Sequence, residues 1–146
     1  MACAHPFNIY DKETREYIGQ APCGRCINCL VDRRNSIDDL CQEELYQRNF
    51  CASYLTVTYD DYHLDWRDNW HGKLVPSINK NDAVKFVKRL RSYMDYHKID
   101  SPILQKDFRY ICCAEYGADG SRPHLHFVFF GLDYRAAAKM FRECWR

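Results

Sequence analysis

Two histidines separated by one residue, His124 and His126, lie in the apolar run RPHLHFVFFG, residues 122–131. The β-branched and aromatic content of this run predicts a β-strand. Side chains two positions apart in a strand point to the same face of the sheet, so the two imidazoles share a face. The apolar residues that alternate with them share the other face and are predicted as core. The histidines therefore lie on the more open face.

A carboxylate is expected beside these imidazoles. The preceding segment, FRYICCAEYG, predicts a second strand, and a symmetric turn from Gly117 to Arg122 puts Glu115 directly opposite His124. Two imidazoles and one carboxylate are a ligand set for a divalent metal ion, so Glu115, His124 and His126 are the predicted ligands. In the alternative, the histidines are satisfied by hydrogen bonds and Glu115 is their ion-pair partner. A register shift of one residue would move Glu115 to the other face.

The cysteines suggest a second metal site. Cys23, Cys26 and Cys29 follow Cys-x-x-Cys-x-x-Cys spacing, and Cys3 is a candidate fourth ligand, which His5 could replace. Four thiolates bind zinc as a closed tetrahedral structural site. An iron–sulfur cluster is the rival, and unliganded thiols in a loop are the simplest alternative.

Around these sites the sequence predicts an α+β fold in which an antiparallel sheet carries helices on one face. Residues 51–60 predict the first strand of this sheet, and Gly117 and Gly120 suit the turn between the last two strands. Helices are expected at residues 35–49, capped by Ser36, at 81–97, and at 134–145.

The chain is expected to have two parts. Residues 1–49 form a cysteine-rich, zinc-binding segment, a metal-tied coil followed by the first helix, and residues 50–146 form the main domain. Residues 61–77 are predicted as a long loop whose Trp66, Trp70 and His71 either contact a ligand or are buried in the core.

The helix at 81–97 is predicted to pack through one apolar stripe, made of Ala83, Val87, Leu90 and Met94. Four basic residues lie largely off that stripe: Lys85, Lys88, Arg89 and Arg91. They are expected to form a solvated face, with a phosphate-facing role open for one or two of them.

Composition sets broader limits. The chain has 146 residues, 47% apolar and 28% charged, as in a folded protein, and its net charge of +1 requires any basic surface to be local. Its apolar runs are far shorter than the ~20 residues that span a bilayer. The N-terminal residues show no secretion signal, so we expect a cytosolic protein with reduced cysteines and no membrane partner.

The motifs together resemble those of a known family. RPHLHFVFFG is similar to the histidine–hydrophobic–histidine motif of the HUH endonucleases, which initiate rolling-circle replication, and YLTVTYDDYHL resembles their first motif. With PCGRCINCLVDRR, AVKFVKRLR and RYICCAEYGADGSRPHLHFVFFG, the resemblance extends over nearly the whole chain to the replication initiators of gokushovirus-like microviruses, which are single-stranded DNA phages.

The resemblance implies chemistry on a DNA phosphodiester. It implies magnesium or manganese held by His124, His126 and a third ligand, which by geometry is Glu115. It also implies a tyrosine that nicks single-stranded origin DNA and stays attached to the 5′-phosphate, leaving a 3′-hydroxyl that primes synthesis. The implied partners are origin DNA and host replication proteins, in the cytoplasm of a bacterial host. The expected DNA-contacting residues are Tyr54, Thr56, Thr58 and Arg122.

One element of the family pattern is missing. The catalytic tyrosine of these enzymes follows the histidine motif, typically as Tyr-x-x-Lys on a helix, and no such motif follows His126. Tyr134 stands too close behind the histidine strand to return over the metal. We therefore expect a chain truncated before the catalytic tyrosine. The alternative function is a zinc-stabilised module that binds single-stranded nucleic acid without cutting it; a hydrolase that uses activated water is a weaker third, because no general base is evident.

Overall fold

The computed structural model describes residues 2–117 and 122–145 and divides the chain into two compact units, Met1–Glu43 and Glu44–Arg146. Gly120, expected in the turn of the histidine hairpin, lies outside the described residues. The sequence-based boundary between residues 49 and 50 lies close to the division after Glu43, on the other side of the end of one helix.

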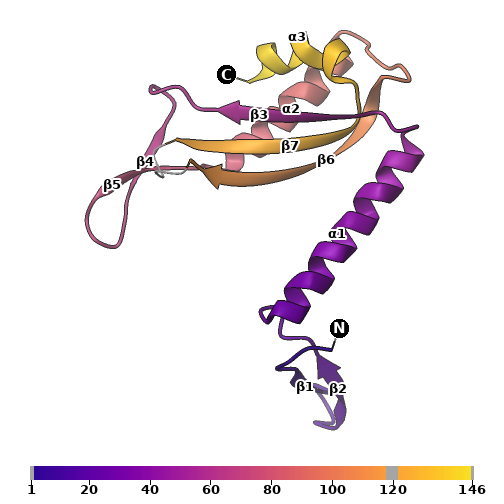
Figure 1. The fold of residues 1–146 in the computed structure, drawn as a ribbon, viewed down its shortest axis with the longest axis vertical. Coiled ribbons are helices and arrows are strands. Elements are labelled where there is room, and N and C mark those ends of the chain that lie inside the picture. Colours follow the sequence, from indigo (N-terminus) through magenta and orange to yellow (C-terminus); the bar gives the residue numbers. More distant parts are fainter. Residues whose placement is uncertain (1, 118–121, 146) are drawn as a thin grey trace. The chain divides into compact units, whose positions relative to one another are not determined.

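The second unit is built on a three-stranded antiparallel sheet with the order β3-β7-β6. Its strands are β3 (Ala52–Thr58), β6 (Leu104–Tyr116) and β7 (Pro123–Leu132). Helices α2 (Lys80–Tyr96) and α3 (Tyr134–Cys144) lie on the same side of this sheet (Figure 1). The expected α+β class, with an antiparallel sheet and helices on one face, is confirmed for this unit.

Burial explains why β7 holds the central place. Leu125, Phe127 and Phe129 are 2% exposed or less, and they form one core cluster with residues of α2 and α3. Phe86 of α2 packs edge-on against Phe127, and Phe141 of α3 stacks on Phe129 at 5.2 Å. The face predicted as core is therefore the face that the helices cover, and the histidines lie on the other one.

The two covering helices begin at side-chain caps. Asn79 accepts a hydrogen bond from the amide of Asn81 at the start of α2, and Asp133 accepts one from Ala136 at the start of α3. Val87, Leu90 and Met94 of the predicted α2 stripe are buried, whereas Ala83 is only partly buried. Phe86, fully buried beside Val87, widens the stripe by one position that the sequence analysis did not include.

The segment expected to be a long loop contains a hairpin, which corrects that prediction. Strands β4 (Asp65–Asp68) and β5 (Leu74–Ser77) pair antiparallel, and the side chain of Asn69 accepts hydrogen bonds from two turn amides. Trp66 and Trp70 are 53% and 92% exposed, so the core-burial alternative for these two side chains is wrong.

The first unit also has more regular structure than expected. Strands β1 (Phe7–Tyr10) and β2 (Tyr17–Ala21) form a hairpin where a coil was predicted. Helix α1 (Ile27–Gln47) begins eight residues before the predicted start at residue 35 and extends into the second unit. Ser36 therefore lies inside the helix, where its hydroxyl donates to the carbonyl of Asp32, and it is not a cap.

Among the residues described, no helix combines the length and the apolar character that crossing a membrane requires.

Candidate functional site

The pairing of β6 with β7 brings the three predicted ligand residues together. Glu115 is the cross-strand partner of His124, which is the register expected from the sequence. Oε2 of Glu115 lies 3.0 Å from Nε2 of His126 and 3.8 Å from Nε2 of His124. One ligand atom from each residue lies within 4.8 Å of the others. The imidazoles are largely covered, at 19% and 17% exposure, whereas the carboxylate is 63% exposed, so the cluster opens to solvent beside Glu115.

The second nitrogen of His124 is fixed by the backbone. Nδ1 lies 3.0 Å from the carbonyl oxygen of Arg122. A carbonyl only accepts hydrogen bonds, so Nδ1 carries the proton and the lone pair is on Nε2, the nitrogen that faces Glu115. This is the arrangement that orients a metal-binding histidine.

The second nitrogen of His126 is held by hydroxyl groups of β3. Oγ1 of Thr56 lies 2.9 Å from Nδ1, and the hydroxyl of Tyr54 also contacts that nitrogen. A hydroxyl donates or accepts, so both neutral tautomers of His126 are satisfied, including the one whose lone pair is on Nε2. Sequence analysis placed Tyr54 and Thr56 on the face of the histidines but missed this contact. The signal was available, because Thr56 is the cross-strand partner of His126.

The four residues expected to contact DNA lie near this cluster. Thr58 is paired with His124, and the ring of Tyr54 stacks on His126 at 5.6 Å while remaining 59% exposed. Arg122 precedes β7 and forms an ion pair of 3.1 Å with Asp61. The open face of the sheet thus carries an exposed aromatic ring, two threonines and, at its end, a guanidinium group.

Tyr134, the tyrosine that follows the histidines in the sequence, is on the other side of the sheet. It begins α3, whose buried residues pack against Phe129 on the covered face. The histidines belong to the open face, so the helix that carries Tyr134 is separated from them by the sheet. This geometry agrees with the expectation that Tyr134 cannot return over the cluster.

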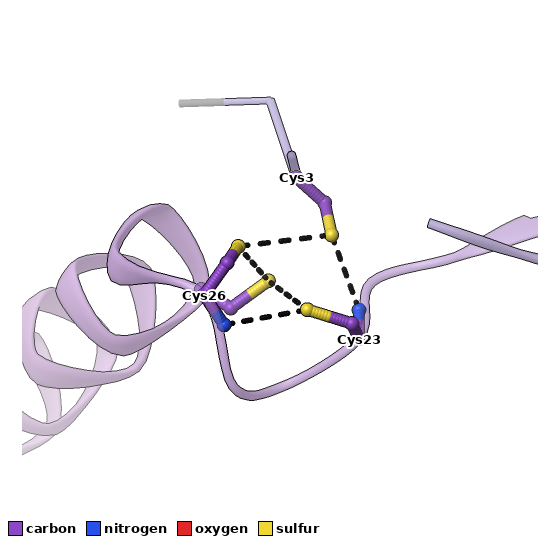
Figure 2. Close-up of side chains that lie close together, drawn as sticks. Cys3, Cys23 and Cys26 are labelled. Atoms are coloured by element: carbon purple, nitrogen blue, oxygen red, sulfur yellow. Dashed lines mark hydrogen bonds between the residues drawn. The ribbon is translucent and has the colours of Figure 1, made fainter. Parts of the chain in front are cut away.

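The four predicted zinc ligands converge between the N-terminus, the end of β2 and the start of α1. The sulfur atoms of Cys3, Cys23 and Cys26 are turned toward one another (Figure 2). Sulfur–sulfur distances are 3.5 Å between Cys26 and Cys29, 3.9 Å between Cys3 and Cys26, and 4.0 Å between Cys23 and Cys29. All four sulfurs belong to one group of ligand atoms, and His5 is not part of it.

The surroundings of the cluster favour thiolates at two positions. The backbone amide of Cys29, followed by that of Ala4, lowers the pKa of Cys26 to about 6. The amides of Arg25 and Cys26 lower the pKa of Cys23 below its ordinary value. Burial raises the pKa of the Cys29 thiol to about 12. Amides at the start of a helix thus offer partial positive charge to two of the four sulfurs.

Comparison with known proteins identifies relatives of this chain. The family model of the replication-associated protein ORF2 matches residues 52–146. The chain is 28% identical to replication-associated protein ORF2 of Spiroplasma virus 4, over 90% of the chain and 45% of the relative. It is 30% identical to replication-associated protein ORF4 of Chlamydia phage 1, over 82% of the chain and 26% of the relative.

A third relative is replication-associated protein VP4 of Bdellovibrio phage phiMH2K, at 29% identity over 76% of the chain and 31% of the relative. The chain therefore spans less than half the length of each of these three relatives. No solved structure matches it. Because the family match covers well over half of the residues, and the resemblance to phage replication initiators is thereby confirmed, the chain belongs to the family of the replication-associated protein ORF2.

Proposed function

We propose that this chain is the metal-binding, DNA-nicking part of a phage replication initiator. The observation that carries the proposal is the convergence of Glu115, His124 and His126 on the open face of the central strand. Neighbouring ligands of an octahedral ion with bonds of ~2.1 Å lie about 3.0 Å apart. The Glu115–His126 distance of 3.0 Å has that value, and His124, at 3.8 Å, needs only a small side-chain movement.

The contacts behind the imidazoles support the same assignment. The carbonyl of Arg122 orients His124, and the hydroxyls of Tyr54 and Thr56 hold Nδ1 of His126. Each histidine therefore directs Nε2 toward Glu115. In the alternative, in which Glu115 is only an ion-pair partner, nothing requires both nitrogens to converge on one carboxylate oxygen.

Magnesium or manganese, when bound by these three residues, would polarise the scissile phosphate and offset the charge that develops on it. The rest of the work falls to the protein. The exposed ring of Tyr54 offers a stacking surface for a base, and Thr58 offers a hydroxyl to the sugar–phosphate backbone. With a net charge of only +1, the chain is expected to bind a strand modestly and with marked salt dependence.

In the proposed reaction a tyrosine oxygen bonds to phosphorus while the bond from phosphorus to the 3′-oxygen breaks, leaving a free 3′-hydroxyl. Two described tyrosines can be considered for this role. The hydroxyl of Tyr54 lies at Nδ1 of His126, away from Glu115. Tyr134 begins a helix on the covered face. Neither is positioned to attack a phosphate at the cluster, which favours the second candidate function, a single-strand binder that does not cut.

For the cysteine cluster we propose a structural zinc. Four sulfurs around an ion with bonds of ~2.3 Å lie about 3.8 Å apart at the corners of a tetrahedron. The sulfur–sulfur distances of 3.5–4.0 Å bracket this value. The lowered pKa values of Cys23 and Cys26 supply two thiolates near neutral pH. Zinc is preferred to an iron–sulfur cluster because replication chemistry needs no electron transfer.

We expect purified protein to contain about one zinc per chain, and Cys26→Ser to lose both the zinc and much of the stability of the first unit, because binding energy of a structural zinc is folding energy. Elemental analysis and thermal unfolding are the measurements. Cys41→Ser, which changes a cysteine of the same helix outside the cluster, is the control and should keep its zinc. A folded wild-type protein without bound metal would rule out the site.

We expect manganese to raise the melting temperature of the wild type but to have much less effect on His124→Ala. A ligand at 100 times its Kd stabilises the folded state by about 2.7 kcal/mol. His71→Ala, which removes an exposed histidine outside the cluster, should respond like the wild type. Equal shifts in the His124→Ala and His71→Ala proteins would remove the site from consideration.

The hydroxyls behind His126 should matter for the ion without touching it. We expect the double substitution Tyr54→Phe/Thr56→Val to lower manganese affinity about 10- to 100-fold, the usual effect of losing such supporting groups. Thr58→Val, on the same strand and face, is the matched control and should change the affinity little. Titration calorimetry measures both, and an unchanged affinity in the double variant would show that the two hydroxyls do not orient His126.

We expect the 146-residue chain to bind labelled single-stranded origin DNA in the presence of manganese and to form no covalent adduct on a denaturing gel. An adduct in this chain that disappears in Tyr134→Phe would show that the nucleophile is misassigned. An adduct in a chain that continues past residue 146, with none in the shorter chain, supports nicking. Binding without an adduct in either chain supports the non-cutting module.

A further inference from the structure

A cavity of about 940 Å³ opens at the end of the sheet, next to the candidate site. It is lined by the end of β3, by the segment that follows it, by the first half of α2 and by Trp145. Two of its lining residues connect it with the histidine cluster. Thr58 is the cross-strand partner of His124, and the backbone of Arg122 holds Nδ1 of His124. A strand bound at the cluster can therefore continue directly into this cavity.

The basic residues of the cavity come from two elements. Lys85 and Arg89 are one helical turn apart on α2, and Arg122 precedes β7. The ion pairs of two of these cations are easily exchanged. Lys85 is 3.8 Å from Asp82 and its side chain is 64% exposed, while the side chain of Arg122 is 61% exposed beside Asp61. Exposed pairs of this kind contribute little stability, so a phosphate can replace the carboxylate partner at low cost.

The two carboxylates that line the cavity are already engaged by neutral or weakly basic partners. Asp60 accepts from the amide of His63 and lies 2.6 Å from its Nδ1, and these contacts, the imidazole first, lower the pKa of Asp60. Asp82 accepts from the hydroxyl of Tyr59 at 3.3 Å. Three permanent cations thus face two carboxylates, which leaves the cavity with an excess of positive charge.

An aromatic wall completes the cavity, and it is held rigidly. The indole Nε1 of Trp145 donates to the carbonyl of Thr58 at 3.0 Å, and its ring contacts Tyr59 edge-on at 5.5 Å. Another edge of the indole packs against Phe86 of the core. Trp145 is only partly buried, so part of its ring is available to a ligand. A rigid aromatic surface beside cations is the combination that binds a base and its phosphate.

We propose that this cavity takes one nucleotide of the bound DNA strand, next to the phosphate held at the histidine cluster. Its phosphate contacts Lys85, Arg89 and Arg122, and its base packs on Trp145. The volume is within the range of pockets that enclose a small molecule, and it exceeds what a single phosphate needs. The inference rests on the proposed function, because it takes the occupant from the strand bound at that site.

The test uses Trp145 as its own reporter. The sequence contains three tryptophans, so Trp66→Phe/Trp70→Phe leaves Trp145 alone, and both replaced side chains are exposed. In this background a ten-residue oligodeoxythymidylate should quench the Trp145 emission saturably. Thymidine 5′-monophosphate should do so more weakly, because it lacks the contacts at the cluster.

Two matched double substitutions on α2 then separate the cavity from general charge. Lys85→Gln/Arg89→Gln removes the cavity cations, and Lys80→Gln/Lys88→Gln removes the same charge from exposed positions of the same helix. We expect the first pair to weaken oligonucleotide binding about tenfold or more. Each lost phosphate contact should lower the slope of log K against log salt by about 0.7. The second pair should change the affinity less than about threefold.

The possible results decide separately on the cavity and on the proposed function. Equal losses in the two pairs, or binding by the wild type that neither pair changes, overturn the cavity and leave the proposed function standing. Tighter binding of the mononucleotide than of the oligonucleotide overturns the assignment to a DNA strand. A wild type that binds no oligonucleotide overturns the proposed function as well. The manganese shift in melting temperature, measured in Lys85→Gln/Arg89→Gln, should match the wild type and so confirm that the metal site is intact.

Discussion

The register of β6 against β7 is the constraint on which the candidate site depends. Side chains alternate along a strand, so a shift of one residue would move Glu115 to the face that α2 and α3 cover. The same shift in β7 would exchange His126 for Phe127 in the core. Burial of an aromatic side chain contributes about 1.5–3 kcal/mol, and a buried imidazole without partners would add a penalty. The fully buried Phe127 and Phe129 therefore hold the histidines on the open face.

The central position of β7 explains why polar groups converge there. A middle strand has a neighbour on each side, and both contribute to the cluster. β6 supplies the carboxylate of Glu115, and β3 supplies the hydroxyls of Tyr54 and Thr56. One neighbour thus provides a ligand, and the other orients the ligand that β7 provides. An edge strand would lack one of these contributions, and its imidazoles would keep one nitrogen in solvent.

The sequence was sufficient for features that depend on local alternation, such as the pairing of Glu115 with His124. It did not reveal β1, β2, β4 and β5, because their side chains are mostly exposed and show no apolar alternation that would mark a strand. Helix α1 was started too late because its first turns carry cysteines and exposed residues instead of an apolar stripe. The cavity could not be found because its parts are distant along the chain: Trp145 bonds to the carbonyl of Thr58, 87 residues earlier.

The first unit depends on a different interaction, because it has almost no core. Among residues 2–43, Cys29 is the single buried residue, and the apolar side chains of the hairpin and of α1 are largely exposed. A segment of this size without a core needs a cross-link to hold its elements together. The contacts that join the N-terminus to the start of α1 are those of the cysteine sulfurs and one hydrogen bond from Asn28 to the carbonyl of Ala2. The arrangement of β2, the N-terminus and α1 around one point is therefore best explained if the four thiols share an ion. In that case the cysteines have in this unit the structural role that Phe127 and Phe129 have in the other.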